Sequence, residues 1–282
     1  MYHRGVRRFI PILLLILANI FVWTATAGAG ELTVSFLDVG QGDSILIESP
    51  TGVQMLVDGG PDGAVLRELG SRLGFFDRTL DAVVETHPDQ DHIGGLPDVF
   101  ERYRVETFIE PRISNDTSAT VAIINAVKNE EDVKKIVARR GMRILLGGGA
   151  YADILYPDRD VDAFETNTGS IVMRVVYGST SFVLTGDSPE GIEKYLVSLD
   201  AEGLNSDVLK AGHHGSKTST SEVFVKAVSP TYGVISAGKD NRYGHPHKDV
   251  VSRLNAEGVQ ILSTAERGAV TFVSDGRLLE VK

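Results

Sequence analysis

The chain of 282 residues contains no cysteine. Neither a disulfide framework nor a thiolate metal site can therefore form, and any bound metal must be held by nitrogen and oxygen ligands. No internal linker rich in proline, glycine or serine divides the sequence, and no repeat is evident. The hydrophobic content of 42% is typical of a globular protein with a sizeable core.

Positive charge is also scarce, since 28 Lys and Arg residues face 38 Asp and Glu residues and the formal net charge is -10. The chain becomes more negative still after its first thirty residues, which carry three arginines and no acid. A broadly basic nucleic-acid surface is therefore missing. The densest basic stretch, Lys134 to Arg143, is typical of a solvated helix face and its exit.

A long apolar run occurs only at the start, where arginines at positions 4, 7 and 8 precede the uncharged segment 9–30. This pattern predicts a secretory signal in residues 1–30, and Ala25, Thr26 and Ala27 provide a small-x-small cleavage pattern. If it is not cut, the same segment can anchor the chain in a membrane. Either alternative places one domain, residues 31–282, outside the cytoplasmic membrane as an exported protein: periplasmic, extracellular or anchored to the outer face.

Short β-branched runs and helical periodicities alternate through the rest of the sequence. Strands are expected over 32–37, 44–48, 53–58, 82–86, 106–110, 152–156, 171–177, 181–185, 207–211, 232–236, 260–263, 269–273 and 278–281. Helices are expected over 64–73, 93–100, 117–140, 190–198, 221–228 and 248–257. The first three strands should be antiparallel. The order of elements predicts an α/β (α+β) fold with two mixed sheets covered by outer helices.

The segment from His87 to His92 places two imidazoles and two carboxylates, those of Asp89 and Asp91, in one turn between a buried strand and a helix. Four potential ligands in one turn favour a metal site. The alternative is a surface loop whose side chains only cap the next helix, but capping needs a single short polar side chain.

Two further groups of polar residues follow predicted strands. Asp187 comes after Thr185 and Gly186, and alone it is more typical of a turn. His213 and His214 lie between glycines, which favours ligation or catalysis over packing. Ser219 and Glu222 form a capping-box pattern, so the histidine pair should precede a helix amino terminus suited to an anion.

Together these segments resemble the metallo-β-lactamase superfamily, and within it the ComEC-type hydrolase domain of DNA-uptake (competence) proteins. The motifs that carry the resemblance are Asp-Val-Gly-Gln-Gly-Asp-Ser at 38–44, the histidine turn, His-His-Gly-Ser at 213–216 and Tyr-Gly-His-Pro-His at 243–247. The many membrane helices of a full uptake channel are missing from this sequence. The resemblance therefore implies a metallo-β-lactamase αββα sandwich acting as a stand-alone exported hydrolase.

The resemblance also implies two divalent metal ions, Zn or Mn, and a ligand set. His87 and Asp89 would bind one metal, Asp91, His92 and one of His213 or His214 the other, and Asp187 would bridge them. Asp89 stands where many relatives have histidine. No histidine lies between His92 and His213, where many relatives supply a third ligand, so either Asn167 or water completes the first site or that site is weak. Carboxylates in place of imidazoles shift the preference from zinc towards manganese.

Several residues are expected to support this centre. Asp58 matches the superfamily's first acidic motif, where the carboxylate orients ligands, although it could also be a turn former before two glycines. Asp43 and Gln41 are supporting residues only, because they could likewise be turn formers. Asp91 and His245 are the catalytic candidates, because His245 or His247 could reach the substrate as proton donor or phosphate ligand unless both lie in an exposed loop.

The leading hypothesis is an exported metal-dependent phosphodiesterase or nuclease in which a hydroxide held by two metals attacks a phosphodiester, with DNA as a candidate substrate. The acidic surface counts against long duplex DNA and favours a smaller diester, such as a nucleotide or a phosphocholine ester. A lactonase or β-lactamase agrees less well with oxygen-rich ligands. A non-catalytic envelope binding module would lack ligands that are present here. No protein partner is predicted, and the membrane is a partner only if the first segment stays uncleaved.

Overall fold

The computed structural model describes residues 30–282, in which Glu31–Lys282 forms one compact unit. The signal or anchor predicted for the first thirty residues lies outside the described part, apart from Gly30. Within the described part, no helix combines the length and the apolar character that crossing a membrane requires.

The first sheet begins with the three antiparallel strands expected from the sequence. It continues through parallel strands on one side and is closed on the other side by the C-terminal hairpin. Its order is β17 (Leu279–Val281), β16 (Val270–Ser274), β1 (Leu32–Phe36), β2 (Ile45–Glu48), β3 (Gln54–Val57), β5 (Ala82–Val84), β7 (Thr107–Glu110) and β8 (Lys134–Val137).

The second sheet has antiparallel strands at one edge and four parallel strands at the other. Its order is β15 (Gln260–Ser263), β14 (Tyr232–Ile235), β13 (Val208–Lys210), β12 (Thr180–Leu184), β11 (Val172–Tyr177), β10 (Ala150–Tyr156) and β9 (Arg143–Gly147). A small parallel pair joins β4 (Thr79–Leu80) to β6 (Arg104–Val105).

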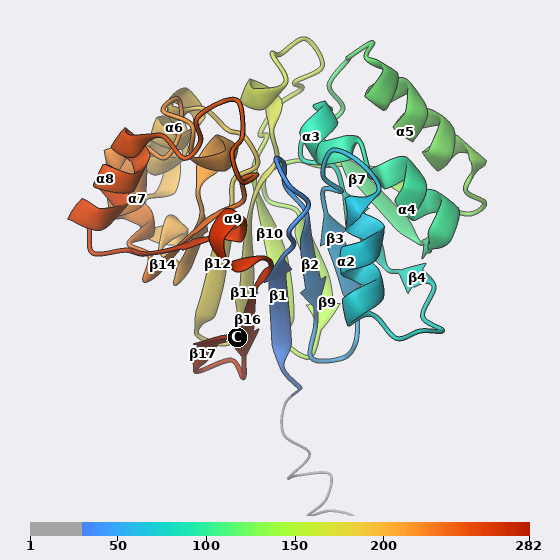
Figure 1. Ribbon diagram of the computed structural model, residues 1–282, viewed down its shortest axis with the longest axis horizontal. Coiled ribbons are helices and arrows are strands. Elements are labelled where there is room, and N and C mark those ends of the chain that lie inside the picture. Colours follow the sequence, from blue (N-terminus) through green and yellow to red (C-terminus); the bar gives the residue numbers. More distant parts are fainter. Residues whose placement is uncertain (1–29) are drawn as a thin grey trace, which may run out of the picture. The chain divides into compact units, whose positions relative to one another are not determined.

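Helices cover the outer face of each sheet (Figure 1). The helices beside the first sheet are α2 (Ala64–Arg72), α3 (Gln90–Ile93), α4 (Leu96–Arg102) and α5 (Ser118–Asn129). Those beside the second sheet are α6 (Glu190–Asp200), α7 (Glu222–Val228) and α8 (Lys248–Ala256). The remaining short helical segments are α9 (Thr264–Arg267), η1 (Asn167–Gly169), η2 (Glu202–Leu204) and η3 (Gly212–Gly215).

Three apolar layers hold this arrangement together. Side chains of both sheets form the central layer, in which Phe272 packs edge-on against Phe36 and Phe182. A second layer lies between the first sheet and its helices, and a third between the second sheet and its helices. The predicted sandwich of two mixed sheets covered by helices is therefore confirmed.

The structure corrects the interpretation of residues 117–140 as helical throughout. Helix α5 ends at Asn129, and Lys134–Val137 forms β8, paired in parallel with β7. The basic stretch therefore begins on an edge strand, where lysines discourage pairing with another chain, and not on a helix face. The expected helix 93–100 is likewise two short helices, α3 and α4, separated by Gly94 and Gly95.

The predicted capping box of Ser219 and Glu222 is also wrong. Helix α7 has Ser221 at its N-cap, and no side chain of that residue caps it. The Ser219 hydroxyl donates to the Ser188 carbonyl instead. The buried Glu193 carboxylate of α6 accepts the backbone amides of Thr220 at 2.5 Å and Ser221 at 2.7 Å. A carboxylate of the protein thus already occupies the position where the sequence indicated an external anion.

Candidate metal centre

The histidine turn leaves β5 and enters α3 with its two imidazoles completely buried. Asp89 occupies the N-cap position of α3 but makes no side-chain cap hydrogen bond. The interpretation of this turn as helix capping is therefore wrong for Asp89. The Asp89 Oδ2 atom lies 3.6 Å from His87 Nε2, and the Asp91 Oδ2 atom lies 3.1 Å from His214 Nε2.

Asp58 holds the Nδ1 edge of His92 directly and that of His87 through Thr86. Its Oδ2 atom lies 2.8 Å from His92 Nδ1 and accepts the Thr86 hydroxyl at 2.7 Å, while Oδ1 accepts the Thr86 amide at 2.8 Å. The Thr86 Oγ1 atom lies 3.1 Å from His87 Nδ1. Because these contacts make each Nδ1 a donor, the Nε2 lone pairs of His87 and His92 point the other way.

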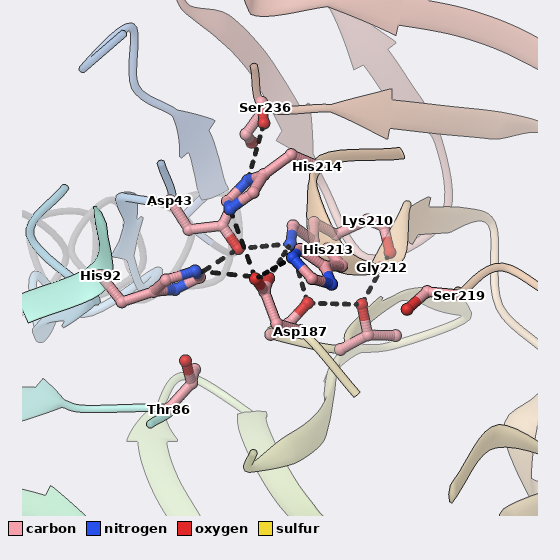
Figure 2. A network of polar contacts seen from close by, with 12 residues as sticks. Asp43, Thr86, His92, Asp187, Lys210, Gly212, His213, His214, Ser219 and Ser236 are labelled. Carbon is pink, nitrogen blue, oxygen red and sulfur yellow. Dashed lines mark hydrogen bonds and ion pairs between the residues drawn. The ribbon is translucent and has the colours of Figure 1, made fainter. Parts of the chain in front are cut away.

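Asp187, which follows β12, lies where the Nε2 atoms converge (Figure 2). Its carboxylate oxygens lie 3.3 Å from His92, 3.4 Å from His214, 3.5 Å from His213 and 4.0 Å from His87, measured to Nε2 in each case. The sequence alone made Asp187 more typical of a turn. The structure instead brings this carboxylate and four imidazoles together from both sheets, at the carboxyl ends of parallel strands.

The structure distinguishes the two adjacent histidines. His214 is buried, and its Nδ1 lies 3.0 Å from the Ser236 carbonyl, so that Nε2 faces Asp187 and Asp91. The His213 side chain is 29% exposed, and its Nδ1 contact is a long one of 3.4 Å to Thr218. Both residues have left-handed backbone conformations, with φ of 49° and 55°. Such strained residues cluster at functional sites. His214 is therefore oriented by a backbone carbonyl, as expected of a metal ligand, and His213 lies at the mouth of the metal centre.

The donor atoms fit a divalent cation. The Nε2 atoms of His87, His92 and His214 and the Oδ1 atom of Asp187 are buried and have no hydrogen-bond partner. Burial lowers the pKa of His92 and of His214, but Asp187 and the neighbouring carboxylates outweigh it and raise both pKa values well above the usual range. The same imidazoles hold the pKa of Asp187 well below its usual range despite its burial. These groups attract positive charge, which a metal cation would supply.

Four buried residues, Asp43, His92, Asp187 and His214, place ligand atoms within 4.8 Å of one another. Asp43, however, lies on the Nδ1 edges of His214 and His92, at 3.4 and 3.9 Å, whereas Asp187 lies on their Nε2 edges. A cation at the Nε2 edges is therefore on the far side of the imidazoles from Asp43. We assign Asp43 to positioning His214.

Lys210 is a buried residue of the centre for which the sequence predicted no role. Its fully buried ammonium contacts the Asp43 carboxylate, donates to the Gly186 carbonyl at 2.9 Å and lies 3.6 Å from Asp187 Oδ1. Burial raises the pKa of Asp43, but Lys210 and His214 outweigh it and lower this pKa to about 2. A lysine within the apolar strand 207–211 was the signal for this role, because a buried lysine needs a charged partner.

Asn167 and His245 lie less centrally. The Oδ1 atom of Asn167 is buried without a hydrogen-bond partner, but no contact of Asn167 with the histidines or carboxylates is observed. The His245 ring lies 5.7 Å from that of His213 and 6.5 Å from that of His214. His247 accepts the Asp249 amide as the N-cap of α8, so its Nδ1 is used locally. His245 is therefore the loop histidine beside the centre.

Comparison with known proteins agrees with this fold. Residues 37–239 match the family described as the Metallo-beta-lactamase superfamily, to which the chain therefore belongs. Members of this superfamily are generally metal-dependent hydrolases. The ComEC-type resemblance is also confirmed, because the curated relatives include competence proteins.

The chain is 30% identical to ComE operon protein 3 of Bacillus subtilis over 270 residues, which cover 90% of this chain and 34% of that protein. It is 34% identical to competence protein ComA of Neisseria gonorrhoeae over 245 residues, which cover 86% of this chain and 32% of that protein. The chain thus spans about a third of the length of these relatives.

Among solved structures, the metallo-beta-lactamase fold protein YhfI of Bacillus subtilis superposes with a TM-score of 0.54 at 15% identity. The match covers 82% of this chain and 96% of that one. At this identity the likeness concerns the fold alone.

Proposed function

We propose that this protein is a metal-dependent phosphodiesterase that acts on nucleic acids or smaller diesters outside the cytoplasmic membrane. The observation that carries the proposal is that the buried Asp187 carboxylate and the histidine Nε2 atoms lie together, with the partly exposed Asp89 and Asp91 carboxylates beside them. Carboxylates make this ligand set rich in oxygen, which suits manganese as well as zinc and a phosphoryl substrate more than a carbonyl one.

The charge of the centre supports two cations. Its carboxylates outnumber its single ammonium by four; they are Asp43, Asp58, Asp89, Asp91 and Asp187, and the ammonium is that of Lys210. Two divalent ions would neutralise this excess. His87 and Asp89 would hold one ion, Asp91, His92 and His214 the other, and Asp187 lies between the two groups.

When bound, the cations would polarise phosphoryl oxygens and lower the pKa of a water molecule, which would supply hydroxide as the nucleophile at phosphorus. Asp91, with a side chain 33% exposed, can orient that water at the mouth of the centre. Burial and the neighbouring His213 and His214 lower the pKa of His245. A neutral His245 at pH 7 is suited to donate a hydrogen bond to a phosphoryl oxygen, which favours the phosphate-ligand role over the proton-donor role.

The direct test uses the purified chain with manganese or zinc on bis-p-nitrophenyl phosphate, single-stranded DNA and duplex DNA. Asp187→Asn should lower hydrolysis at least about a hundredfold, because the carboxylate between the two ligand groups is lost. The surface variant Asp153→Asn, which loses only an exposed pair with Arg143, is the matched control. Equal activity of the Asp187 variant and the wild type would contradict the proposal.

A smaller diester is the second candidate substrate, and the net charge of -10 favours it because duplex DNA requires many basic contacts. Cleavage of bis-p-nitrophenyl phosphate without cleavage of either DNA would support it.

The exported location rests on the apolar pattern of the first thirty residues. Fractionation with a carbonate wash tests it: an anchored chain stays with the membrane, a cleaved chain is released, and a cytoplasmic chain contradicts export.

A further inference from the structure

A pocket of about 430 Å³ shares a wall with the metal centre. We call it the Tyr243 pocket, and its lining residues are Gln41, Pro61, Gln90, Asp91, Asn241, Arg242 and Tyr243. Its volume is within the range of roughly 300–1,000 Å³ for small-molecule sites. Asp91 connects the two sites, because it lines the pocket and also contacts His214 at 3.1 Å.

The loop that carries Tyr243 is held in place by hydrogen bonds. The Asn241 amide group donates to the carbonyls of Gly238 at 3.0 Å and His245 at 2.6 Å, and its Oδ1 accepts the amides of Tyr243 and His245. The Gln41 Oε1 atom accepts the Gly238 amide at 3.1 Å. The pocket wall is thus preorganised, which reduces the entropy lost on binding a ligand.

The groups in this pocket have the chemistry of a nucleobase site. The Tyr243 side chain is 54% exposed and stacks on His245, with ring centroids 5.7 Å apart and an interplanar angle of 23°. The Arg242 guanidinium lies 5.0 Å from the Tyr243 ring centroid and donates to its hydroxyl at 2.8 Å. Aromatic rings and guanidinium planes are the surfaces on which unpaired bases stack in proteins.

One of the side chains that line the pocket has a donor without a partner. The Gln41 Nε2 atom is buried and makes no hydrogen bond, although the Oε1 atom of the same amide is bonded to Gly238. A buried donor without a partner is costly, and a ligand oxygen would satisfy it. The positive charge of Arg242 beside the Tyr243 ring repels a quaternary ammonium group, such as that of a phosphocholine ester, but not a neutral base.

We propose that the Tyr243 pocket receives a nucleobase of a substrate whose phosphodiester lies at the metal centre, with Tyr243 as the stacking surface and Gln41 as a donor to the base. This assignment rests on the proposed phosphodiesterase function and narrows its substrate to nucleotide-containing diesters. Stacking accepts every base, so the pocket confers a requirement for a base without preference for a sequence.

The test compares two substrates that differ only in their bases. Thymidylyl-thymidine and its abasic analogue, in which each sugar is a tetrahydrofuran unit without a base, are incubated with the manganese-loaded chain, and the rate of cleavage is measured. The wild type should prefer the dinucleotide, and Tyr243→Ala should lower kcat/KM for it about tenfold while changing the abasic analogue less than about twofold. Tyr243→Phe keeps the ring and should retain most of the preference. Phe76→Ala removes a remote aromatic side chain that is 91% exposed and is the matched control.

Binding gives a second readout that does not need hydrolysis. Adenosine 5′-monophosphate should bind the wild type more tightly than ribose 5-phosphate, and Tyr243→Ala should abolish that difference. If Tyr243→Ala lost the same affinity for both ligands, or lost affinity for neither, the pocket assignment would be overturned. If neither diester is cleaved by the wild type but the base-dependent binding is present, the phosphodiesterase proposal fails while the nucleobase site stands.

Discussion

The ammonium group of Lys210 contacts the carboxylate of Asp43, and both side chains are buried behind the imidazoles of the metal centre. Asp43 in turn faces His214 Nδ1, so the positive charge of Lys210 acts on the candidate ligand His214 through the carboxylate of Asp43. Neither charge has access to water, and each therefore depends on the other for its stability.

Lys210→Met should lower the free energy of unfolding by about 3–5 kcal/mol in urea denaturation with chelator present, because Asp43 is left buried without its cation. The double variant Lys210→Met/Asp43→Asn should recover a large part of this loss, since the unpaired charge of Asp43 is removed as well. Equal stability of the single and double variants would show that packing, and not charge, explains the effect of Lys210.

Asp58→Asn should weaken metal binding about 10–100-fold, because a neutral amide replaces the carboxylate that holds His92 directly and His87 through Thr86. Competition with a chromogenic chelator measures this affinity, and Asp153→Asn is the control of equal chemistry at the surface. Unchanged affinity would favour the alternative in which Asp58 only forms a turn.

His214→Ala should reduce metal affinity far more than His213→Ala. The Ser236 carbonyl orients the buried His214 at Nδ1, whereas His213 is partly exposed and its Nδ1 makes a long contact of 3.4 Å to Thr218. Titration of each variant with manganese, followed by equilibrium dialysis and elemental analysis, measures the affinity and the number of bound ions. A larger loss in the His213 variant would reverse the assignment.

Stability should depend on pH through Glu193, whose pKa is raised from 4.5 by burial in spite of its hydrogen bonds to the amides of Ser221 and Thr220. Below pH 4.5 the group is protonated in both the folded and the unfolded chain. As the pH rises, the unfolded chain loses this proton first, and the stability contribution is lost on passing through the raised folded pKa. Relative to Glu193→Gln, the wild type should therefore become less stable with rising pH, as measured by urea denaturation. If the free energies of unfolding of the wild type and of Glu193→Gln changed with pH in parallel, the proposed dependence of stability on Glu193 would be contradicted.

The sequence predicted most of the strands and helices because their polar and apolar residues alternate with the correct period. It failed at Lys134–Val137, where apolar residues at helical spacing form β8 instead. Pairing with β7 decides that segment, and no local pattern reveals a partner more than twenty residues away.

The residues of the candidate centre could be named from motifs, but their roles depend on geometry. Only the structure shows that His214 has a backbone partner at Nδ1 and that Asp43 lies on the opposite imidazole edge from Asp187. The motif order indicated neither relationship. Lys210 was missed because its function depends on Asp43, which lies far from it in the chain and in the other half of the sandwich.

The loops of the candidate centre come from both sheets: Asp58 and the histidine turn follow strands of the first, and Asp187 and His214 follow strands of the second. Bound cations would therefore join the two half-sandwiches as well as activate a substrate. Occupancy of the centre should slow amide hydrogen exchange in β5 and β13 together, and chelation should accelerate both. Cooperative opening of the whole sandwich would then depend on the concentration of free metal ions around the protein.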